Sequence, residues 1–316
     1  MIDALIFATL NGLLTGLLLF LLASGLTLIF SMMGVLNFAH ASFHMLGAYC
    51  AWSIGQFTGF WPALLLAPLL VGGLGALVER YGLRHVHRAG HVAELVFTFG
   101  LAFVIEQAVQ SFWGPDTKNY QPPALLDFPL FTLFGQDFPA YKAFMLLISL
   151  GIFIGLYAVL TRTRTGLIIQ AATTHPQTVA SLGHNLPLLH TLVFGAGSAL
   201  AALAGVLAGP VLGTFPGMAA TLGSIVFVIV VIGGLGSLTG ALLASLLIGL
   251  LQSWAIAVDL GMPDLLHWLG VEFPVDHPLR DIWRLNLPQL APVLPYLLLV
   301  LMLIFRPSGL FGRREG

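Results

Sequence analysis

The chain has 316 residues, of which 58% are hydrophobic and only 8% are charged. Soluble globular domains carry about 25% charged residues, so lipid rather than water must be the solvent over most of this surface. The formal net charge of −1 argues against a nucleic-acid partner, and the single cysteine excludes an internal disulfide.

Nine apolar stretches are candidates for membrane spans, because a span needs roughly 20 apolar residues. In chain order they cover residues 5–31, 41–58, 62–80, 92–113, 142–161, 188–211, 221–234, 238–257 and 289–305. The two short stretches, 41–58 and 221–234, are candidates for partial helices. We therefore expect an all-α integral membrane protein, a polytopic bundle of about eight to ten transmembrane segments that forms a single domain over residues 1–316.

The basic residues predict the orientation, since cytoplasmic loops carry an excess of Lys and Arg. Eight of the twelve fall in three segments, which contain Arg80, Arg84 and Arg88, then Arg162 and Arg164, then Arg306, Arg313 and Arg314. All three face the cytoplasm if the N terminus lies outside and nine spans follow. The loops at about 114–141 and 258–288 are then periplasmic, and the second is acidic through Asp259, Asp264, Glu272, Asp276 and Asp281.

Two segments, Gly34–Ser42 and Gly233–Gly240, interrupt the apolar pattern at junctions between spans. A helix that breaks at membrane depth survives only inside protein or beside a polar cavity, because hydrocarbon cannot satisfy the freed backbone groups. Interrupted segments in both halves indicate a central transport path. We predict that this path is lined by Asn37, His40, Ser42, Gly233, Gly234, Gly236 and Ser237. The alternative is that these glycines serve close helix packing and tight turns.

Two carboxylates lie in the apolar run 92–113. Glu106 must face protein or water, and we interpret it as a group near the outer interface, with a lining of the path as the alternative. Glu94 is expected to pair with Arg84 or Arg88. His40 and His44 share a helix face, but a metal site needs a third ligand, so no metal site is predicted.

A polar segment at about 162–187 is expected to form short amphipathic helices that face the cytoplasm. The apolar positions are Ala171, Ala172, Val179, Ala180 and Leu182, Pro176 opens the second helix, and Gly183–Asn185 supplies a stop. A short exposed helix of this kind suits docking in the groove of a partner. The alternative is a helix that lies flat on the lipid headgroups.

Taken in order, these stretches resemble the permeases of branched-chain amino acid ABC importers of the LivH type. The resemblance is carried by residues 25–49, 79–88, 95–101, 164–185, 194–210, 233–240 and 305–312. It implies a vitamin-B12-importer-like architecture with discontinuous helices. It also implies a coupling segment that contacts ATPase subunits through Arg164, Gly166, Ala171, Ala172, Gly183 and Asn185, with His184 replacing the isoleucine usual in the family.

The function implied by the resemblance is that of a permease subunit in an ATP-driven importer of branched-chain or other hydrophobic amino acids. The expected partners in the bacterial inner membrane are a second permease of the LivM type, two ATP-binding cassette ATPases, a periplasmic binding protein and membrane lipid. No GxxxxGKS or GxxxxGKT loop occurs, so ATP and Mg²⁺ belong to the partner subunits and the chain itself is not expected to be an enzyme or to hold a cofactor.

Several alternatives stay open at this point. Urea, short amides and aromatic acids are other substrates for the same class of importer. A stand-alone channel or ion-coupled carrier would need a coupling-ion site, for which Glu106 is the one interior carboxylate. An intramembrane enzyme would need a nucleophile, a base and a carboxylate in one aqueous cleft, and no such set stands out.

Overall fold

Helices dominate the computed structural model, which describes residues 2–133, 135–258, 261 and 286–312. Nine helices in these residues coincide with the predicted spans: α1 (Ile2–Met33), α2 (His40–Thr58), α3 (Phe60–Val78), α5 (His91–Trp113), α6 (Ala140–Arg162), α9 (Leu186–Leu212), α10 (Met218–Gly233), α11 (Leu238–Ala257) and α15 (Leu294–Phe305). Of these, α1, α3, α5, α6, α9 and α11 are long and apolar enough to cross a membrane, and α10 and α15 are shorter apolar helices. The all-α prediction is confirmed.

Short elements connect the long helices. At one end lie η1 (Glu79–Leu83), α4 (Arg84–Val86), η2 (His87–Ala89), α7 (Arg164–Thr174) and α8 (Pro176–Ser181). The others are η3 (Ala124–Leu126), β1 (Pro129–Leu133), β2 (Gln136–Pro139) and α14 (Leu287–Leu290). The predicted span 289–305 is divided between α14 and α15, because Pro292 and Pro295 lack the N–H that a continuous helix needs.

The loop 114–141 departs from the all-helical expectation, since β1 and β2 form an antiparallel hairpin there. Thr132 lies opposite Asp137, and its hydroxyl donates to the Asp137 carboxylate at 2.5 Å. Most of the hairpin is exposed, so its apolar residues are not explained by burial in this chain.

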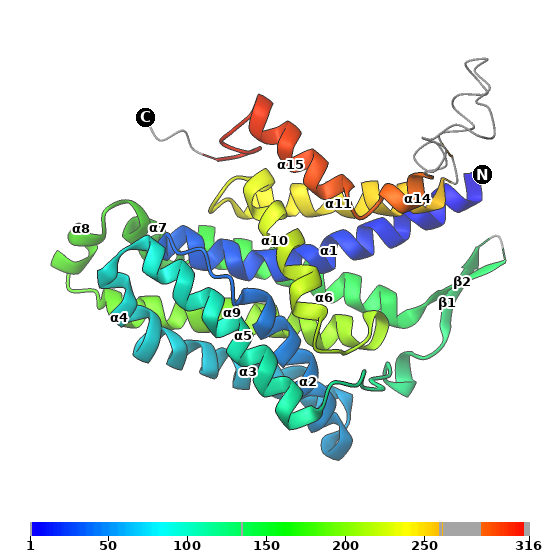
Figure 1. The fold of residues 1–316 in the computed structure, drawn as a ribbon, viewed down its shortest axis with the longest axis horizontal. Coiled ribbons are helices and arrows are strands. Elements are labelled where there is room, and N and C mark those ends of the chain that lie inside the picture. The colour runs from blue at the N-terminus through cyan, green and yellow to red at the C-terminus, as the bar shows by residue number, and fades with distance from the viewer. Residues whose placement is uncertain (1, 134, 259–260, 262–285, 313–316) are drawn as a thin grey trace, which may run out of the picture.

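Helix α1 lies at the centre of the bundle and packs against α6, α9, α10 and α11 (Figure 1). Its contact with α11 is a backbone contact: a Cβ on Gly249 would lie 2.5 Å from the Gly12 carbonyl oxygen and 2.7 Å from the Gly16 Cα atom. Lipid provides no hydrophobic drive for helices to associate, so small residues that let backbones approach are the main source of packing energy.

We expect Gly249→Leu to force α1 and α11 apart. Overpacking a tight core costs about 1–3 kcal/mol, and here the obstacle is backbone rather than a movable side chain. Thermal unfolding of the detergent-solubilised protein should show a clear loss of stability. Gly155→Leu is the matched control, because a Cβ at Gly155 of α6 meets nothing within 4 Å. Equal stability of the two variants would contradict the packing argument.

The described parts of the three basic segments gather at one end of the bundle, where α4, α7, α8 and the end of α15 lie, while the N terminus and the β-hairpin lie at the other (Figure 1). This is the grouping that the positive-inside rule requires. Which end faces the cytoplasm stays a prediction. Arg313, Arg314 and the acidic residues Asp259, Asp264, Glu272, Asp276 and Asp281 lie outside the described residues.

Candidate functional site

The first predicted break is a real interruption of the helical backbone, between the end of α1 and the start of α2. Gly34 has φ +67° and its N–H donates to the Phe30 carbonyl at 2.9 Å, which ends α1. The chain then runs back along α1, so that the His40 Nε2 atom lies 2.9 Å from the Leu22 carbonyl oxygen. The break therefore sits beside the interior of α1 rather than at its tip.

The backbone groups freed by the break find partners from side chains. The Asn37 Oδ1 atom accepts the Ala39 N–H at 3.1 Å, and the Thr98 hydroxyl of α5 accepts the Phe38 N–H at 3.3 Å. Asn37 and Thr98 are both buried. Protein rather than hydrocarbon thus satisfies the break, as its depth demands.

A cavity of about 340 Å³ opens at the break, within the range of roughly 300–1,000 Å³ that is usual for small-molecule sites. Its walls come from α1, the break, α2, α5 and α10. The lining residues are Leu26, Leu36, Asn37, Phe38, His40, Ala41, Ser42, Phe99, Ala102, Phe103, Glu106, Ala219, Ala220, Gly223, Ser224, Val226 and Phe227. Three of the seven predicted path residues, Asn37, His40 and Ser42, are therefore brought together at one mainly apolar cavity.

Two polar atoms in this wall lack hydrogen-bond partners among the described residues, namely Asn37 Nδ2 and His40 Nδ1. The Leu22 carbonyl can only accept, so His40 Nε2 is assigned the proton, and Nδ1 of the neutral ring is then an acceptor. A buried polar atom without a partner costs about 1–3 kcal/mol. The wall therefore holds hydrogen-bonding capacity that the described part of the protein does not use.

Glu106 also lines the cavity, half-buried on α5. This position agrees with the alternative interpretation of Glu106, as a lining of the path, rather than with the preferred one of an interfacial group. A signal was present in the sequence: Phe99, Phe103 and Glu106 are spaced i, i+4, i+7, so they share one helix face. Only the packing of α5 against the break turns that face toward a cavity.

The second predicted break lies apart from this cavity. Gly234 and Gly236 have φ +96° and +81°, and the Ser237 hydroxyl accepts the Gly240 N–H at 3.1 Å to cap α11. The chain after α15 fills the site, where the Phe311 N–H donates to the Gly233 carbonyl at 3.1 Å. Gly233, Gly234, Gly236 and Ser237 thus serve a tight turn in the structure, and their part in a path stays a prediction.

The predicted coupling segment forms α7 and α8, which rest on the ends of α1 and α9. Ile169, Ala172 and Val179 are buried in one cluster with Leu28, Met32 and Val193. The other predicted apolar positions, Ala171, Ala180 and Leu182, are exposed, as is Arg164 at the start of α7. The segment therefore has one face held by the membrane helices and one face free within the described chain.

The predicted stop at Gly183 is confirmed in its geometry. Gly183 has φ +87°, its N–H donates to Ala180, and the His184 N–H donates to Val179 at 3.3 Å, which together make a Schellman motif. Asn185 has a different local role from the one expected. Its side chain accepts the Leu188 N–H at 3.0 Å and so caps α9.

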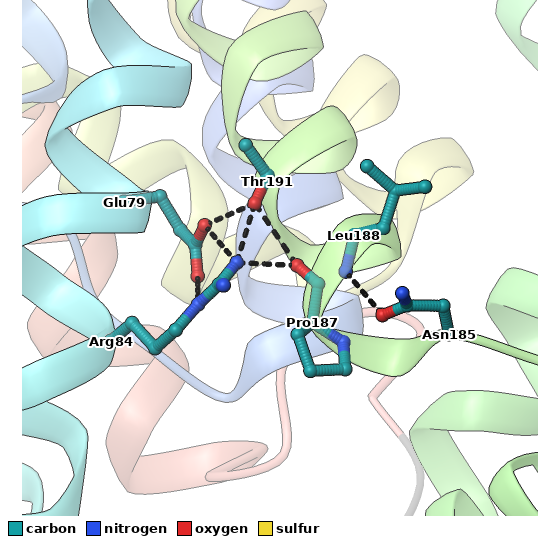
Figure 2. A network of polar contacts seen from close by, with 6 residues as sticks. All are labelled: Glu79, Arg84, Asn185, Pro187, Leu188 and Thr191. Atoms are coloured by element: carbon teal, nitrogen blue, oxygen red, sulfur yellow. Dashed lines mark hydrogen bonds and ion pairs between the residues drawn. The ribbon is translucent and has the colours of Figure 1, made fainter.

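A polar network ties the start of α9 to the turn after α3 (Figure 2). Buried Glu79 accepts from Arg84 Nε at 3.2 Å and from Arg84 Nη2 at 2.9 Å. Arg84 Nη2 also lies 2.6 Å from both the Pro187 carbonyl oxygen and the Thr191 hydroxyl, and that hydroxyl donates to Glu79 at 2.5 Å. Because α9 follows α8 directly, this network fixes the position at which the coupling segment joins the bundle.

The expectation that Glu94 pairs with Arg84 or Arg88 is wrong. Arg84 is engaged by Glu79, and the buried Glu94 carboxylate instead contacts His87 Nδ1 and, at 3.1 Å, His91 Nδ1. The turn through η1 and η2 brings these histidines back over the first turn of α5. Sequence spacing alone did not distinguish these partners.

Comparison with known proteins supplies the wider context. A family profile described as branched-chain amino acid transport system / permease component matches residues 8–304. The chain is 27% identical to the high-affinity branched-chain amino acid transport system permease protein BraD of Pseudomonas aeruginosa, over 96% of this chain and 95% of that protein. It is 26% identical to the corresponding protein LivH of Escherichia coli K12, over 96% and 94%.

A solved structure, PsaBC from Streptococcus pneumoniae in complex with Fab, aligns over 94% of this chain and 91% of its own, with a TM-score of 0.46 and 11% identity.

Proposed function

The chain belongs to the family of branched-chain amino acid transport system permease components, and on that premise we propose that it forms half of the membrane path of an ATP-driven importer. Its cargo is a branched-chain or other hydrophobic amino acid. Two ATPase subunits, a LivM-type second permease and a periplasmic binding protein complete the complex. The N terminus faces the periplasm and the C terminus the cytoplasm.

The observation that carries this proposal is the cavity at the helix break. It lies at the first predicted break, between α1, α2, α5 and α10, and its walls are mainly apolar. An apolar wall fits the side chain of leucine, isoleucine or valine. Urea, which is small and polar, would leave such a wall unfilled.

Close packing gives a route by which the ATPases can act on this cavity. Helix α9 follows the coupling segment and meets α2 backbone to backbone: a Cβ on Gly205 would lie 2.0 Å from the His44 carbonyl oxygen. It also meets α1 at Gly25, where a Cβ would lie 2.4 Å from the Gly197 oxygen and 2.9 Å from the His40 ring. A shift of α9 therefore reaches the cavity wall without passing through a loop.

The proposal is tested by isolating the tagged chain from its host in mild detergent and identifying what co-purifies. A P-loop ATPase and a second permease are expected. The complex is then reconstituted in vesicles with ATP and loaded binding protein, and the uptake of labelled leucine is compared with that of urea. Uptake of leucine that persists without the ATPases would favour a stand-alone channel or carrier instead.

Filling the cavity should block transport. We expect Ala220→Phe to reduce leucine uptake strongly, because Ala220 lines the cavity and is exposed there, so the larger ring has room to enter it. Ala158→Phe makes the same change on the exposed face of α6, away from the cavity. Initial uptake rates at equal protein levels give the comparison. Equal rates for the two variants would show that this cavity is not on the path.

A further inference from the structure

Among the residues that line the cavity is one carboxylate, that of Glu106, and a simple apolar path does not require it. Within the described residues, no hydrogen bond or ion pair holds this carboxylate. The other two carboxylates buried in the bundle are both paired, Glu79 with Arg84 and Glu94 with two histidines. Glu106 differs from them in facing a cavity.

An unpaired carboxylate inside a membrane span is expensive, and such groups mark the pathways of solutes or ions. Glu106 caps no helix and pairs with no basic residue in the described chain, so it does nothing evident for the fold. The next residue, Gln107, is exposed. A polar side chain in this part of α5 can therefore lie on the outer surface of the chain instead of in the cavity.

Aromatic rings share the cavity with Glu106. Four phenylalanines line the same cavity and contact one another: Phe38 stacks on Phe227 with ring centroids 5.9 Å apart, and Phe99 lies edge-on to Phe38 at 6.4 Å and to Phe103 at 5.0 Å. The faces of aromatic rings attract cations, and a carboxylate does so more strongly. A carboxylate and aromatic rings in one apolar cavity favour an ammonium group over a neutral amide or a carboxylate.

We propose that Glu106, together with the phenylalanine cluster of Phe38, Phe99, Phe103 and Phe227, binds the ammonium group of the transported solute. This inference rests on the proposed function and adds that the permease itself discriminates between solutes, rather than leaving all selection to the binding protein. Solutes with an ammonium group and an apolar side chain are accepted. Urea, short amides and carboxylic acids, which lack the ammonium group, are disfavoured.

The first experiment measures ligand binding without transport. The purified membrane complex in nanodiscs is titrated with leucinamide and with 4-methylpentanamide, two probes that differ only in the ammonium group. A ligand that binds the folded state raises the melting temperature in a concentration-dependent way. Stabilisation by leucinamide and not by 4-methylpentanamide is expected.

Substitutions then locate the effect. In Glu106→Gln, which keeps the shape and removes the charge, the leucinamide concentration for half-maximal stabilisation should rise roughly ten- to hundredfold, as expected for loss of one charge-assisted hydrogen bond. Glu106→Asp keeps the charge and should lose less. Asp127→Asn removes an exposed loop carboxylate and should change nothing. Equal stabilisation by both probes, or an unchanged titration in Glu106→Gln, would overturn the proposal.

Transport separates this proposal from the broader function. If the wild-type complex imports leucine and Glu106→Gln imports it equally well with an unchanged titration, the ammonium site is wrong and the importer stands. If the wild-type complex imports no leucine with its ATPases and loaded binding protein, the proposed function fails. The two-probe titration of the wild type still decides whether the cavity binds an ammonium group.

Discussion

Arg84→Ala is expected to destabilise the protein by about 3 kcal/mol and to reduce leucine uptake. Glu79 is 1% exposed, so removal of Arg84 leaves a buried carboxylate whose remaining side-chain hydrogen bond, among the described residues, comes from the Thr191 hydroxyl. Breaking a buried ion pair costs about 3–5 kcal/mol. The lower end applies because the Arg84 side chain is 34% exposed and water replaces part of its interaction.

The functional loss has a separate cause from the loss of stability. Arg84 also holds the Pro187 carbonyl and Thr191 in the first turn of α9 (Figure 2). Without it, the helix that follows the coupling segment is no longer fixed to the turn after α3. Movement of α7 and α8 is then absorbed at this junction instead of reaching the cavity.

Two further variants separate these effects. The double variant Glu79→Leu/Arg84→Met replaces the whole pair by apolar groups of similar size and should recover most of the stability, as apolar replacements of buried ion pairs often do. It should not recover uptake, since the contacts with α9 are still missing. Arg80→Ala, at an exposed arginine in the same turn, is the control. Full uptake by a stable double variant would show that the network serves stability alone.

Gly166→Val is expected to release the ATPase subunits while the chain stays in the membrane. A Cβ at Gly166 would lie 2.2 Å from the Val159 carbonyl oxygen and 2.4 Å from that of Leu160, both in the last turns of α6. No side chain fits there, so α7 must move away from α6. Because α7 lies outside the spanning helices, insertion of the bundle is not affected.

The measurement is the ratio of ATPase to permease after affinity purification, with the permease level in the membrane determined in parallel. Leu167→Val is the matched control: it places the same β-branched residue in the same helix, at an exposed position outside the predicted coupling residues. It should leave ATPase recovery unchanged. Normal ATPase recovery with Gly166→Val would remove α7 from the coupling role.

Features that depend on local composition and short spacing could be predicted from the residues alone. The spans were predicted from runs of about 20 apolar residues, because a helix of that length and composition is what crosses the hydrocarbon core of a membrane. The glycine and asparagine at 34–37 located the break, and the apolar spacing of 162–187 located the short helices α7 and α8. Gly183 could be identified as a stop because left-handed backbone geometry favours glycine wherever it occurs.

The faces and side chains that meet one another depend on how the helices pack in three dimensions. In a membrane helix almost every face is apolar, so the sequence pattern does not show which face meets protein. That is why the sequence left Glu106 open between the outer interface and the path, why Glu94 was assigned to arginines rather than to His87 and His91, and why the two breaks looked equivalent. The packing of the helices makes the two breaks different: the first opens on a cavity, and the second is filled by the chain that follows α15.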